Sequence, residues 1–306
     1  MSPGDGQVEL LSLESLRPAR PVLRDFRGRV AGLAFSPDGR LLAAVGHGAE
    51  PALWELATGE VRRLVGWRAA DSDWVTFSAD GRTLFTGGSD GANVWDVRTG
   101  RRLLHLDHGG YVPEAQPSPD GKLLATAGGR GEVIIWNLES GRKLATLEAD
   151  DIFAFTARFS PDGKLLATGG RAGIVELWKV GTWKCVGRPM TGHAGFVLSA
   201  SFDPSGRTLV TSSTDGKLRL WDVATQEQLG SGLTGADNYW SVSRFAPDGR
   251  RVVAVFETGR LLLWDVSPER WKEQACAVAG RNLTREEWSR FVTGHSYTTV
   301  CSKLPG

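Results

Sequence analysis

The chain has 306 residues, of which 41% are hydrophobic and 23% charged, a mixture ordinary for globular proteins that disfavours disorder and fibrous structure. Thirty-six basic residues balance 35 acidic ones, so the net charge of +1 attracts neither nucleic acid nor an anionic membrane. No signal peptide and no run of about 18 apolar residues is present, and the cysteines at 185, 276 and 301 form no C-x-x-C pair. We therefore expect a cytoplasmic protein with reduced thiols.

A repeat of about 42 residues runs through most of the chain. Its first marker is a tryptophan that recurs at intervals of 41, 41, 42, 43 and 43 residues, a regularity that chance does not produce. These tryptophans are Trp54, Trp95, Trp136, Trp178, Trp221 and Trp264. Its second marker is a turn tetrapeptide such as SPDG ahead of each tryptophan, with an apolar run of strand length between the two. Each repeat is therefore predicted to contain several short β-strands.

The N-terminal segment opens inside a repeat. Residues 5–13 (DGQVELLSL) align with residues 215–223 (DGKLRLWDV) of the fifth repeat. Residues 20–24 are then an outer strand, which we expect to complete the last repeat, because no outer strand follows Val266. The strand near residues 8–13 then has no place in the last repeat. It is either an extra edge strand or the end of a further repeat, about 30 residues of which lie outside this sequence.

The fifth repeat shows the predicted unit most completely. Strands are expected at 196–202, 209–212, 218–223 and 227–233, with a tight hairpin at Asp215-Gly216 between the second and the third. Four antiparallel strands in about 42 residues form one blade of a β-propeller, in which neighbouring blades cover each other's faces.

The chain resembles a WD-repeat β-propeller, with the namesake dipeptide at Trp95-Asp96, Trp221-Asp222 and Trp264-Asp265. The resemblance covers roughly residues 5 to 266. It implies an all-β fold with six visible four-stranded blades, arranged as a WD-type ring or as an incomplete seven-bladed ring.

The family's structural tetrad of Trp, Ser or Thr, His and Asp carries over in full only to the fifth repeat. There His193, Thr211 or Ser213, Asp215 and Trp221 match. The other repeats lack the histidine, so we expect those blades to rely on packing. The tetrad explains the position of His193, which favours a structural role over metal binding or general base catalysis.

The segment after Val266 changes from strand to helix periodicity. Ser267 and Pro268 suit a helix start that runs to Gly280, and a second helix is expected after Thr284, which has capping-box spacing to Glu287. We expect a propeller over residues 1–266 and a helical tail over residues 267–306 that packs on it.

Residues 275–284, with Glu287-Trp288 and 299–301, resemble the tail of bacterial propeller proteins, in particular the sensor region of actinobacterial STAND signalling NTPases and related regulators. That resemblance implies a role at the receiving end of a signalling protein.

Motifs that carry chemistry are scarce. The G-x-S-x-G pattern at residues 87–91 lies between two predicted strands, where a hairpin turn is expected and a nucleophile elbow is not. His105 and His108 lie near Asp107, but three residues at a strand end are more often solvated than metal-bound. The innermost strands supply few titratable groups beyond Arg158 and Arg244. We therefore expect no catalytic residues, no cofactor and no metal.

One position varies between repeats where structural positions would be constant. It lies seven residues before each turn tetrapeptide and enters the innermost strand from one rim of the central channel. The six residues there are Arg29, Asp71, Tyr111, Phe153, Phe196 and Tyr239. Aromatic residues and arginine are the usual anchors of protein interfaces, so this rim is the candidate binding surface, bordered by polar residues such as Asp73. The alternative is that the aromatic residues pack between adjacent blades.

We therefore expect a non-catalytic scaffold or sensor propeller that binds a protein or peptide, either free-standing or as part of a larger polypeptide. No nucleic acid or membrane partner is expected. Two alternatives stay open: a propeller that senses a small molecule or carbohydrate on its aromatic rim, and, with less support, a propeller hydrolase.

Overall fold

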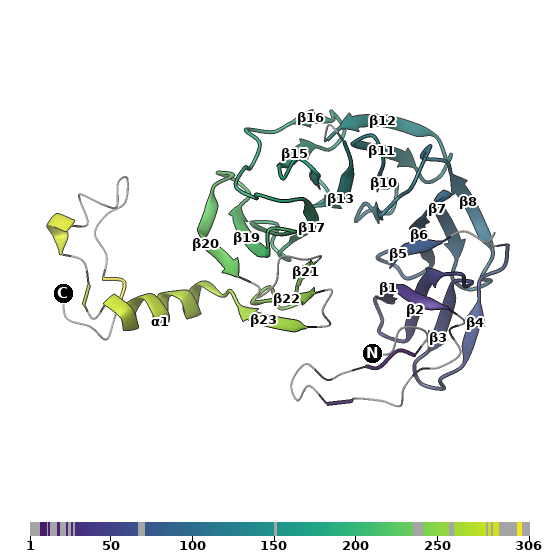
Figure 1. Cartoon of the computed structure of the whole chain (residues 1–306), viewed down its shortest axis with the longest axis horizontal. Coiled ribbons are helices and arrows are strands. Elements are labelled where there is room, and N and C mark those ends of the chain that lie inside the picture. Colours follow the sequence, from purple (N-terminus) through teal and green to yellow (C-terminus); the bar gives the residue numbers. More distant parts are fainter. Residues whose placement is uncertain are drawn as a thin grey trace.

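A computed structural model of the chain shows a mostly β protein with six blades around a central axis and almost no helix (Figure 1). The structure describes residues 7–10, 12, 17–18, 23, 26, 28–66, 71–149, 152–234, 241–256, 260–279, 281–282, 284–287 and 299–301. The predicted fold class is confirmed. Among the described residues, no helix combines the length and the apolar character needed to span a bilayer.

Each blade is an antiparallel meander in which the first strand is innermost. The first blade contains β1 (Arg29–Phe35), β2 (Leu41–His47), β3 (Ala52–Glu55) and β4 (Val61–Arg63). The second contains β5 (Ser72–Phe77), β6 (Thr83–Gly88), β7 (Gly91–Asp96) and β8 (Arg102–Leu106). The third contains β9 (Glu114–Pro117), β10 (Leu123–Ala127), β11 (Glu132–Asn137) and β12 (Lys143–Glu148).

The remaining blades repeat this order. The fourth contains β13 (Ala154–Phe159), β14 (Leu165–Gly170), β15 (Val175–Lys179) and β16 (Lys184–Cys185). The fifth contains β17 (Val197–Phe202), β18 (Thr208–Ser213), β19 (Lys217–Asp222) and β20 (Gln228–Thr234), as its sequence predicts. The sixth contains β21 (Ser241–Phe245), β22 (Arg251–Phe256) and β23 (Leu261–Asp265), and no fourth strand pairs with β23 among the described residues.

The SPDG tetrapeptide forms the turn between the first two strands for local reasons. In the first blade the Ser36 hydroxyl donates to Asp38 at 2.6 Å, and Asp38 accepts the Arg40 backbone N–H at 3.0 Å. Gly39 has a φ of +68°, which a residue without a Cβ adopts at no steric cost. The same bonds recur in blades two to four, so a local sequence signal fixes where each strand pair reverses.

The hydrophobic core is divided into wedges between consecutive blades. In one wedge, Val45 and Leu53 of the first blade pack with Val75 and Phe77 of β5. Equivalent clusters join each later pair of blades. The innermost strand of each blade therefore covers an apolar face of the blade before it, and a single blade could not bury its core alone.

The N-terminal segment has the register of the third and fourth strands of a blade. Val8 pairs with Leu23, and the Ser12 N–H donates to the Arg17 carbonyl at 2.9 Å. The fifth blade shows the same two features 210 residues later, in the pairing of β19 with β20. Leu23 packs on the first blade, beside Trp54. The other residues of the predicted closing strand 20–24 lie outside the described residues, so closure of the last blade by that segment stays a prediction.

The predicted first helix of the tail is α1 (Pro268–Ala279), which extends away from the ring (Figure 1). The Ser267 hydroxyl bonds Asp265 at 2.6 Å. The capping box is confirmed, since Thr284 N–H donates to Glu287 and Glu287 N–H donates to Thr284. The six blade clusters include no residue beyond Val266 in the described part of the chain, so packing of the tail on the propeller stays a prediction.

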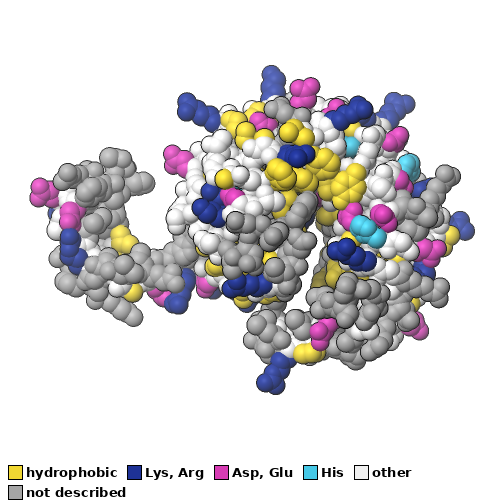
Figure 2. All heavy atoms as spheres, in the orientation of Figure 1, with side chains coloured by type: hydrophobic (Ala, Val, Ile, Leu, Met, Phe, Trp, Pro, Cys, Tyr) yellow, Lys and Arg dark blue, Asp and Glu magenta, His cyan; other side chains and the backbone are white. Residues whose placement is uncertain are grey.

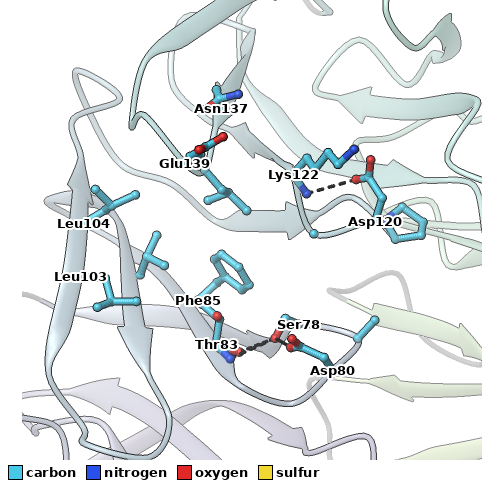
Figure 3. A pocket seen from close by; sticks show the side chains of 15 residues that line it. Ser78, Asp80, Thr83, Phe85, Leu103, Leu104, Asp120, Lys122, Asn137 and Glu139 are labelled. Carbon is cyan, nitrogen blue, oxygen red and sulfur yellow. Dashed lines mark hydrogen bonds between the residues drawn. The ribbon is translucent and has the colours of Figure 1, made fainter.

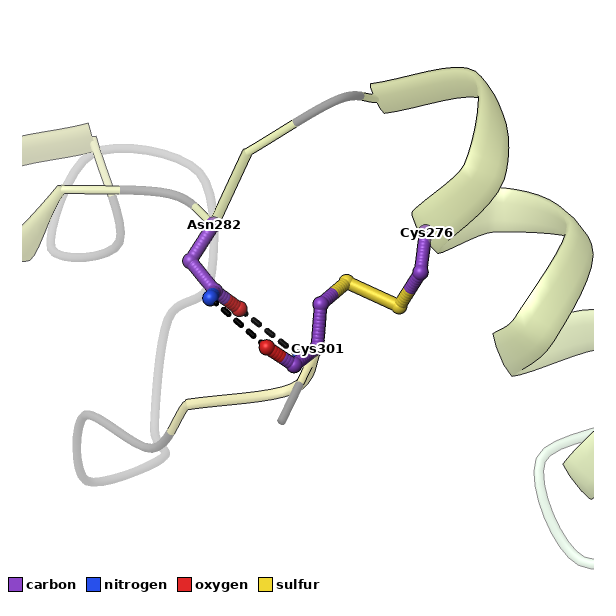
Figure 4. The surroundings of a disulfide bond; sticks show 3 residues. All are labelled: Cys276, Asn282 and Cys301. Atoms are coloured by element: carbon purple, nitrogen blue, oxygen red, sulfur yellow. Dashed lines mark hydrogen bonds between the residues drawn. A yellow bond between two sulfur atoms is a disulfide. The ribbon is translucent and has the colours of Figure 1, made fainter. Parts of the chain in front are cut away.

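The expectation of reduced thiols is wrong for two of the three cysteines. Cys276 of α1 and Cys301 form a disulfide (Figure 4). Asn282 makes two hydrogen bonds to the Cys301 backbone, at 2.9 and 2.7 Å, and thereby holds the returning chain beside the helix. The linear spacing of 25 residues gives no sign of this approach, which depends on how the tail turns back. Cys185 is free and exposed.

Candidate binding surface at the channel rim

Four aromatic side chains from the third, fourth and fifth blades form a continuous arc on one rim of the channel. The distances between ring centroids are 6.2 Å for Tyr111 and Phe153, 4.7 Å for Phe153 and Phe155, and 6.0 Å for Phe155 and Phe196. The structure thus brings together three residues of the predicted rim set and adds Phe155, which sequence reasoning missed. We call these four residues the aromatic arc.

The arc is only partly buried. Tyr111 is 38% exposed, and the three phenylalanines are half-buried. Ile152, 55% exposed, precedes Phe153 and extends the apolar surface. Packing between blades, the alternative considered for these residues, therefore accounts for part of each ring but leaves an apolar surface open to solvent. Figure 2 shows hydrophobic side chains gathered around the mouth of the channel.

A cation lies over one end of the arc. Arg171, exposed in the turn between β14 and β15, places its guanidinium carbon 5.0 Å from the centroid of the Phe196 ring. This geometry is a cation–π interaction, which holds the long side chain on the rim. In the sequence, Arg171 aligns with Thr214 of the fifth repeat, and Ala172 takes the place of the turn aspartate Asp215.

The opposite end of the arc is acidic. The Tyr111 hydroxyl hydrogen-bonds Asp73, and burial together with this carboxylate raises the pKa of Tyr111 above its ordinary value. Asp73 Oδ1 lies 2.5 Å from His47 Nε2, and Asp71 Oδ2 lies 3.8 Å from His47 Nδ1. Asp71 also accepts the Gly48 backbone N–H at 3.1 Å. The rim therefore passes from an acidic cluster through aromatic rings to an arginine.

Two of the other predicted rim residues, Arg29 and Tyr239, are not part of this surface as the structure describes it. Arg29 is exposed at the start of β1 in the first blade, and it has no described contact with the arc. Tyr239 lies outside the described residues. Asp71 belongs to the rim through His47 and Asp73 and does not touch an aromatic ring among the described contacts.

The predicted tetrad of the fifth blade is confirmed, with Thr211 as its hydroxyl member. Thr211 Oγ1 accepts the Trp221 indole N–H at 2.9 Å and bonds His193 Nε2 at 2.9 Å, while His193 Nδ1 lies 3.1 Å from Asp215. Ser213 instead accepts the Asp215 backbone N–H. Burial lowers the pKa of His193, which favours the neutral ring, and its hydrogen bonds make it a structural link.

The prediction that only the fifth blade has the tetrad histidine is wrong. His108 stands 28 residues before Trp136, the same spacing as His193 before Trp221. His108 Nδ1 bonds Thr126 at 2.8 Å, and Thr126 accepts the Trp136 indole N–H at 2.8 Å. Arg130 occupies the place of the aspartate, which leaves His108 Nε2 buried without a partner among the described residues. The spacing was visible in the sequence, but the missing aspartate obscured it.

His108 therefore belongs to a structural link, and His105 bonds Asn93 at 3.0 Å. The two histidines contact different partners and do not converge. Within the described residues, no group of three or more His, Cys, Asp or Glu side chains is placed to hold a metal ion.

The channel contains a carboxylate that sequence reasoning missed. Glu114, 4% exposed at the start of β9, lies 2.6 Å from Arg158 and 3.3 Å from Arg244. It also accepts the Thr156 hydroxyl and the Ala157 backbone N–H. These partners come from the fourth and sixth blades, so the carboxylate ties three blades together. Because its oxygens are fully engaged, Glu114 is not placed to act as an acid or base on a substrate.

A cavity of 610 Å³ lies between the second and third blades, away from the arc (Figure 3). Its walls include Leu103 and Leu104 of β8 and two turn aspartates, Asp80 and Asp120. Each aspartate accepts hydrogen bonds within its own turn, and the bond from the neighbouring serine hydroxyl lowers its pKa. The polar groups here maintain the turns and do not converge on a common point.

Comparison with known proteins supports the repeat assignment. The WD40 family (WD domain, G-beta repeat) matches residues 141–179 and 183–222. The small ribosomal subunit protein RACK1 of Caenorhabditis elegans is 35% identical over 88 residues, 26% of this chain and 27% of that protein. The cross-pathway control WD-repeat protein 2 of Flammulina velutipes is 38% identical over 60 residues, 19% of each chain.

An uncharacterized WD repeat-containing protein of Synechocystis sp. is 31% identical over 134 residues, 42% of this chain and 38% of that protein. The matches thus span between 19% and 38% of the relatives' own lengths. None of these three is named as a signalling NTPase, so the resemblance of the tail to that class stays a prediction. The chain contains WD40 repeats within a six-bladed β-propeller.

Proposed function

We propose that this propeller is a non-catalytic binding module that holds a protein or peptide segment on the aromatic arc. WD40 propellers are a kind of protein-interaction scaffold, which supports this class of function. The observation that carries the proposal is the arc itself, because four neighbouring aromatic rings from three consecutive blades remain partly open to solvent, three of them at equivalent places. Clustered aromatic residues with an arginine are the residues that dominate binding energy at protein interfaces.

The charges on the rim indicate what the bound segment would contain. An apolar or aromatic side chain would pack on the Phe153, Phe155 and Phe196 rings, where it would lose its hydration shell. A basic group would suit the end of the arc near Asp71 and Asp73. An acidic group or a chain carboxylate would suit Arg171 at the other end.

A finer proposal concerns the biological setting. The tail resembles that of bacterial signalling regulators, which supports a sensor propeller at the receiving end of such a protein. A second candidate function, recognition of a small molecule or carbohydrate, is supported by the flat Tyr111 ring beside the Asp73 carboxylate, a pairing that can stack on a sugar and accept its hydroxyl hydrogens. A hydrolase lacks such support because Glu114 is engaged in the ion pairs of the channel.

Peptide selection from a displayed library on the purified chain tests the main proposal. The selected peptide is then titrated against the wild-type chain and three variants, Phe196→Ala, Arg171→Ala and the control Leu144→Ala. Leu144 is 52% exposed on the outer strand β12, so it matches the arc in apolarity but lies elsewhere. We expect Phe196→Ala to weaken binding by roughly 30-fold, the effect of an interface anchor.

Leu144→Ala should leave the affinity within about twofold of the wild-type value. Equal losses of affinity in Phe196→Ala and in Leu144→Ala would refute the proposal. A different outcome is that the library yields no peptide while calorimetry shows that the chain binds a sugar and that Phe196→Ala abolishes this binding. That result would favour the second candidate function, recognition of a small molecule or carbohydrate.

A further inference from the structure

Each blade has a forward face, the face on which the innermost strand of the next blade packs. In the sixth blade this face is apolar and exposed to solvent. Leu263 of β23 is 41% exposed, although the residue at the same place before the blade tryptophan is at most 3% exposed in the other five blades. Those five residues are Leu53, Val94, Ile135, Leu177 and Leu220. Leu261 and Val255 of the same face are 40% and 48% exposed. In the other blades, this face is covered by the innermost strand of the next blade.

The first blade is uncovered on the side where a preceding blade would lie. Phe35, the last residue of β1, is 55% exposed, and Leu33 is 48% exposed. At the equivalent places of the second blade, Phe77 is 7% exposed and Val75 is 5% exposed, because both pack on the first blade. Two complementary halves of an interblade contact are therefore both open to solvent.

The exposed faces of the sixth and first blades do not cover each other, because residues of the N-terminal segment occupy part of the space between them. Val8 and Leu10 align with Leu218 and Leu220, which lie on the forward face of the fifth blade. Val8 and Leu10 accordingly pack in the cluster that covers Trp54 of the first blade, as a preceding blade would. Together with Leu23, paired to Val8, they take the places of the third and fourth strands of a blade that would precede the first. Among the described residues, nothing takes the places of the first two strands of such a blade.

We propose that the opening between β23 and β1 is the seat of these two strands, supplied by polypeptide that continues the chain ahead of Asp5-Gly6. The choice of occupant rests on a turn signal. Asp5-Gly6 aligns with Asp215-Gly216, the hairpin that joins the second strand of the fifth blade to the third. Such a hairpin turn joins two strands, so the second strand of the seventh blade would precede Asp5 directly.

The two faces specify the chemistry of the occupant. Its first strand would end in a large apolar residue, as β17 ends in Phe202, and this residue would cover Leu263. Its second strand would present β-branched or small residues to Leu33 and Phe35, as β18 presents Val210 to the sixth blade. The proposal concerns the seam of the ring and is independent of the aromatic arc.

A graft tests the proposal with the chain's own strands. Residues 196–214, which contain β17 and β18, replace the first four residues so that the copy leads into Asp5-Gly6. We expect a rise of roughly 5 °C in melting temperature, slower amide exchange over 33–35 and 261–263, and weaker binding of the dye ANS. The control graft has the copied Phe202 and Val210 both changed to Asp. Identical melting temperatures and exchange rates for the two grafts would overturn the proposal.

Single substitutions in the ungrafted chain provide a test that does not depend on folding of the graft. We expect Leu263→Ser to reduce ANS binding and leave the melting temperature within about 2 °C of wild type, whereas Leu103→Ser on outer strand β8 should leave ANS binding unchanged. A large loss of melting temperature in Leu263→Ser would mean that the sixth blade packs directly on the first. Loss of a concentration-dependent dimer in that variant would mean that a second copy covers the face. Either result would overturn the proposal.

Discussion

Replacing Thr211 with valine would test whether the buried polar links hold the blades together beyond what packing supplies. Thr211 is fully buried, and its hydroxyl joins the Trp221 indole N–H and His193 Nε2, each at 2.9 Å. Valine has nearly the same shape, so the apolar packing is retained and only the hydroxyl is lost. Two buried groups then have no partner. Since each such group costs about 1–3 kcal/mol, we expect Thr211→Val to lower the free energy of unfolding by about 2–4 kcal/mol.

A matched control comes from the fourth blade. Thr168 is equally buried and accepts the Trp178 indole N–H at 2.9 Å, but no histidine bonds it among the described residues. Thr168→Val should therefore cost only about 1–2 kcal/mol. In the third blade, Thr126 bonds both His108 and Trp136, so Thr126→Val should rank with Thr211→Val.

Equilibrium unfolding in guanidinium chloride at pH 7.5, followed by tryptophan fluorescence, measures these differences as shifts of the midpoint at constant slope. The ranking of the three variants matters more than the absolute losses of unfolding free energy, because all three threonines lie in the same place of a four-stranded blade. Equal losses for Thr211→Val and Thr168→Val would refute the idea that the histidine link adds stability. A loss confined to Thr168→Val would contradict it more strongly.

Further predictions concern pH, the channel and the tail. Burial lowers the pKa of both His108 and His193, so the folded state favours the neutral rings. The denaturant midpoint of unfolding should therefore be highest above about pH 6.5 and fall as the pH drops below that value. His108→Gln should reduce this pH dependence between pH 7.5 and 5.5. Glu114→Gln leaves two guanidinium groups facing each other and should cost about 3–5 kcal/mol in denaturant unfolding, a loss that Arg244→Gln in the same chain should partly reverse. Cys301→Ser opens a loop of 25 residues, so limited proteolysis should cut the tail faster while calorimetry shows an unchanged propeller transition.

The fold could be predicted because its signals are local. A turn such as Ser36 to Gly39 is closed by its own side chains, and the strand between it and Trp54 is marked by a short apolar run. Repetition of these signals along the chain specifies a propeller without any knowledge of long-range contacts. The same reasoning predicted a strand near residues 8–13 and an outer strand at residues 20–24, which it assigned to the last blade. In the structure Val8 pairs with Leu23, and closure of the last blade by the outer strand stays a prediction.

The candidate site could be predicted only in part, because it depends on which side chains meet across blades. Counting positions in each repeat found Tyr111, Phe153 and Phe196. It missed Phe155, which lies two residues after Phe153 and so on the same side of the extended chain, where its ring joins the arc. Glu114 looks like an ordinary polar residue in the sequence, and its role emerges only when Arg244, 130 residues away, lies beside it.

The tail shows the same limit. Its first helix was predictable from periodicity and its capping box from spacing, since both are local. The disulfide between Cys276 and Cys301 was not, because it depends on the path of the chain between them.

The most direct test of the binding proposal is site-specific photo-crosslinking in the source cell. A photoreactive phenylalanine analogue is placed at Phe155 in the aromatic arc and, as the control, at Leu144 on the outer strand β12. We predict a discrete crosslinked adduct with one protein partner at position 155 and none at position 144. Adducts of equal yield at both positions, or an adduct only at position 144, would contradict the proposal that the channel rim is the binding surface.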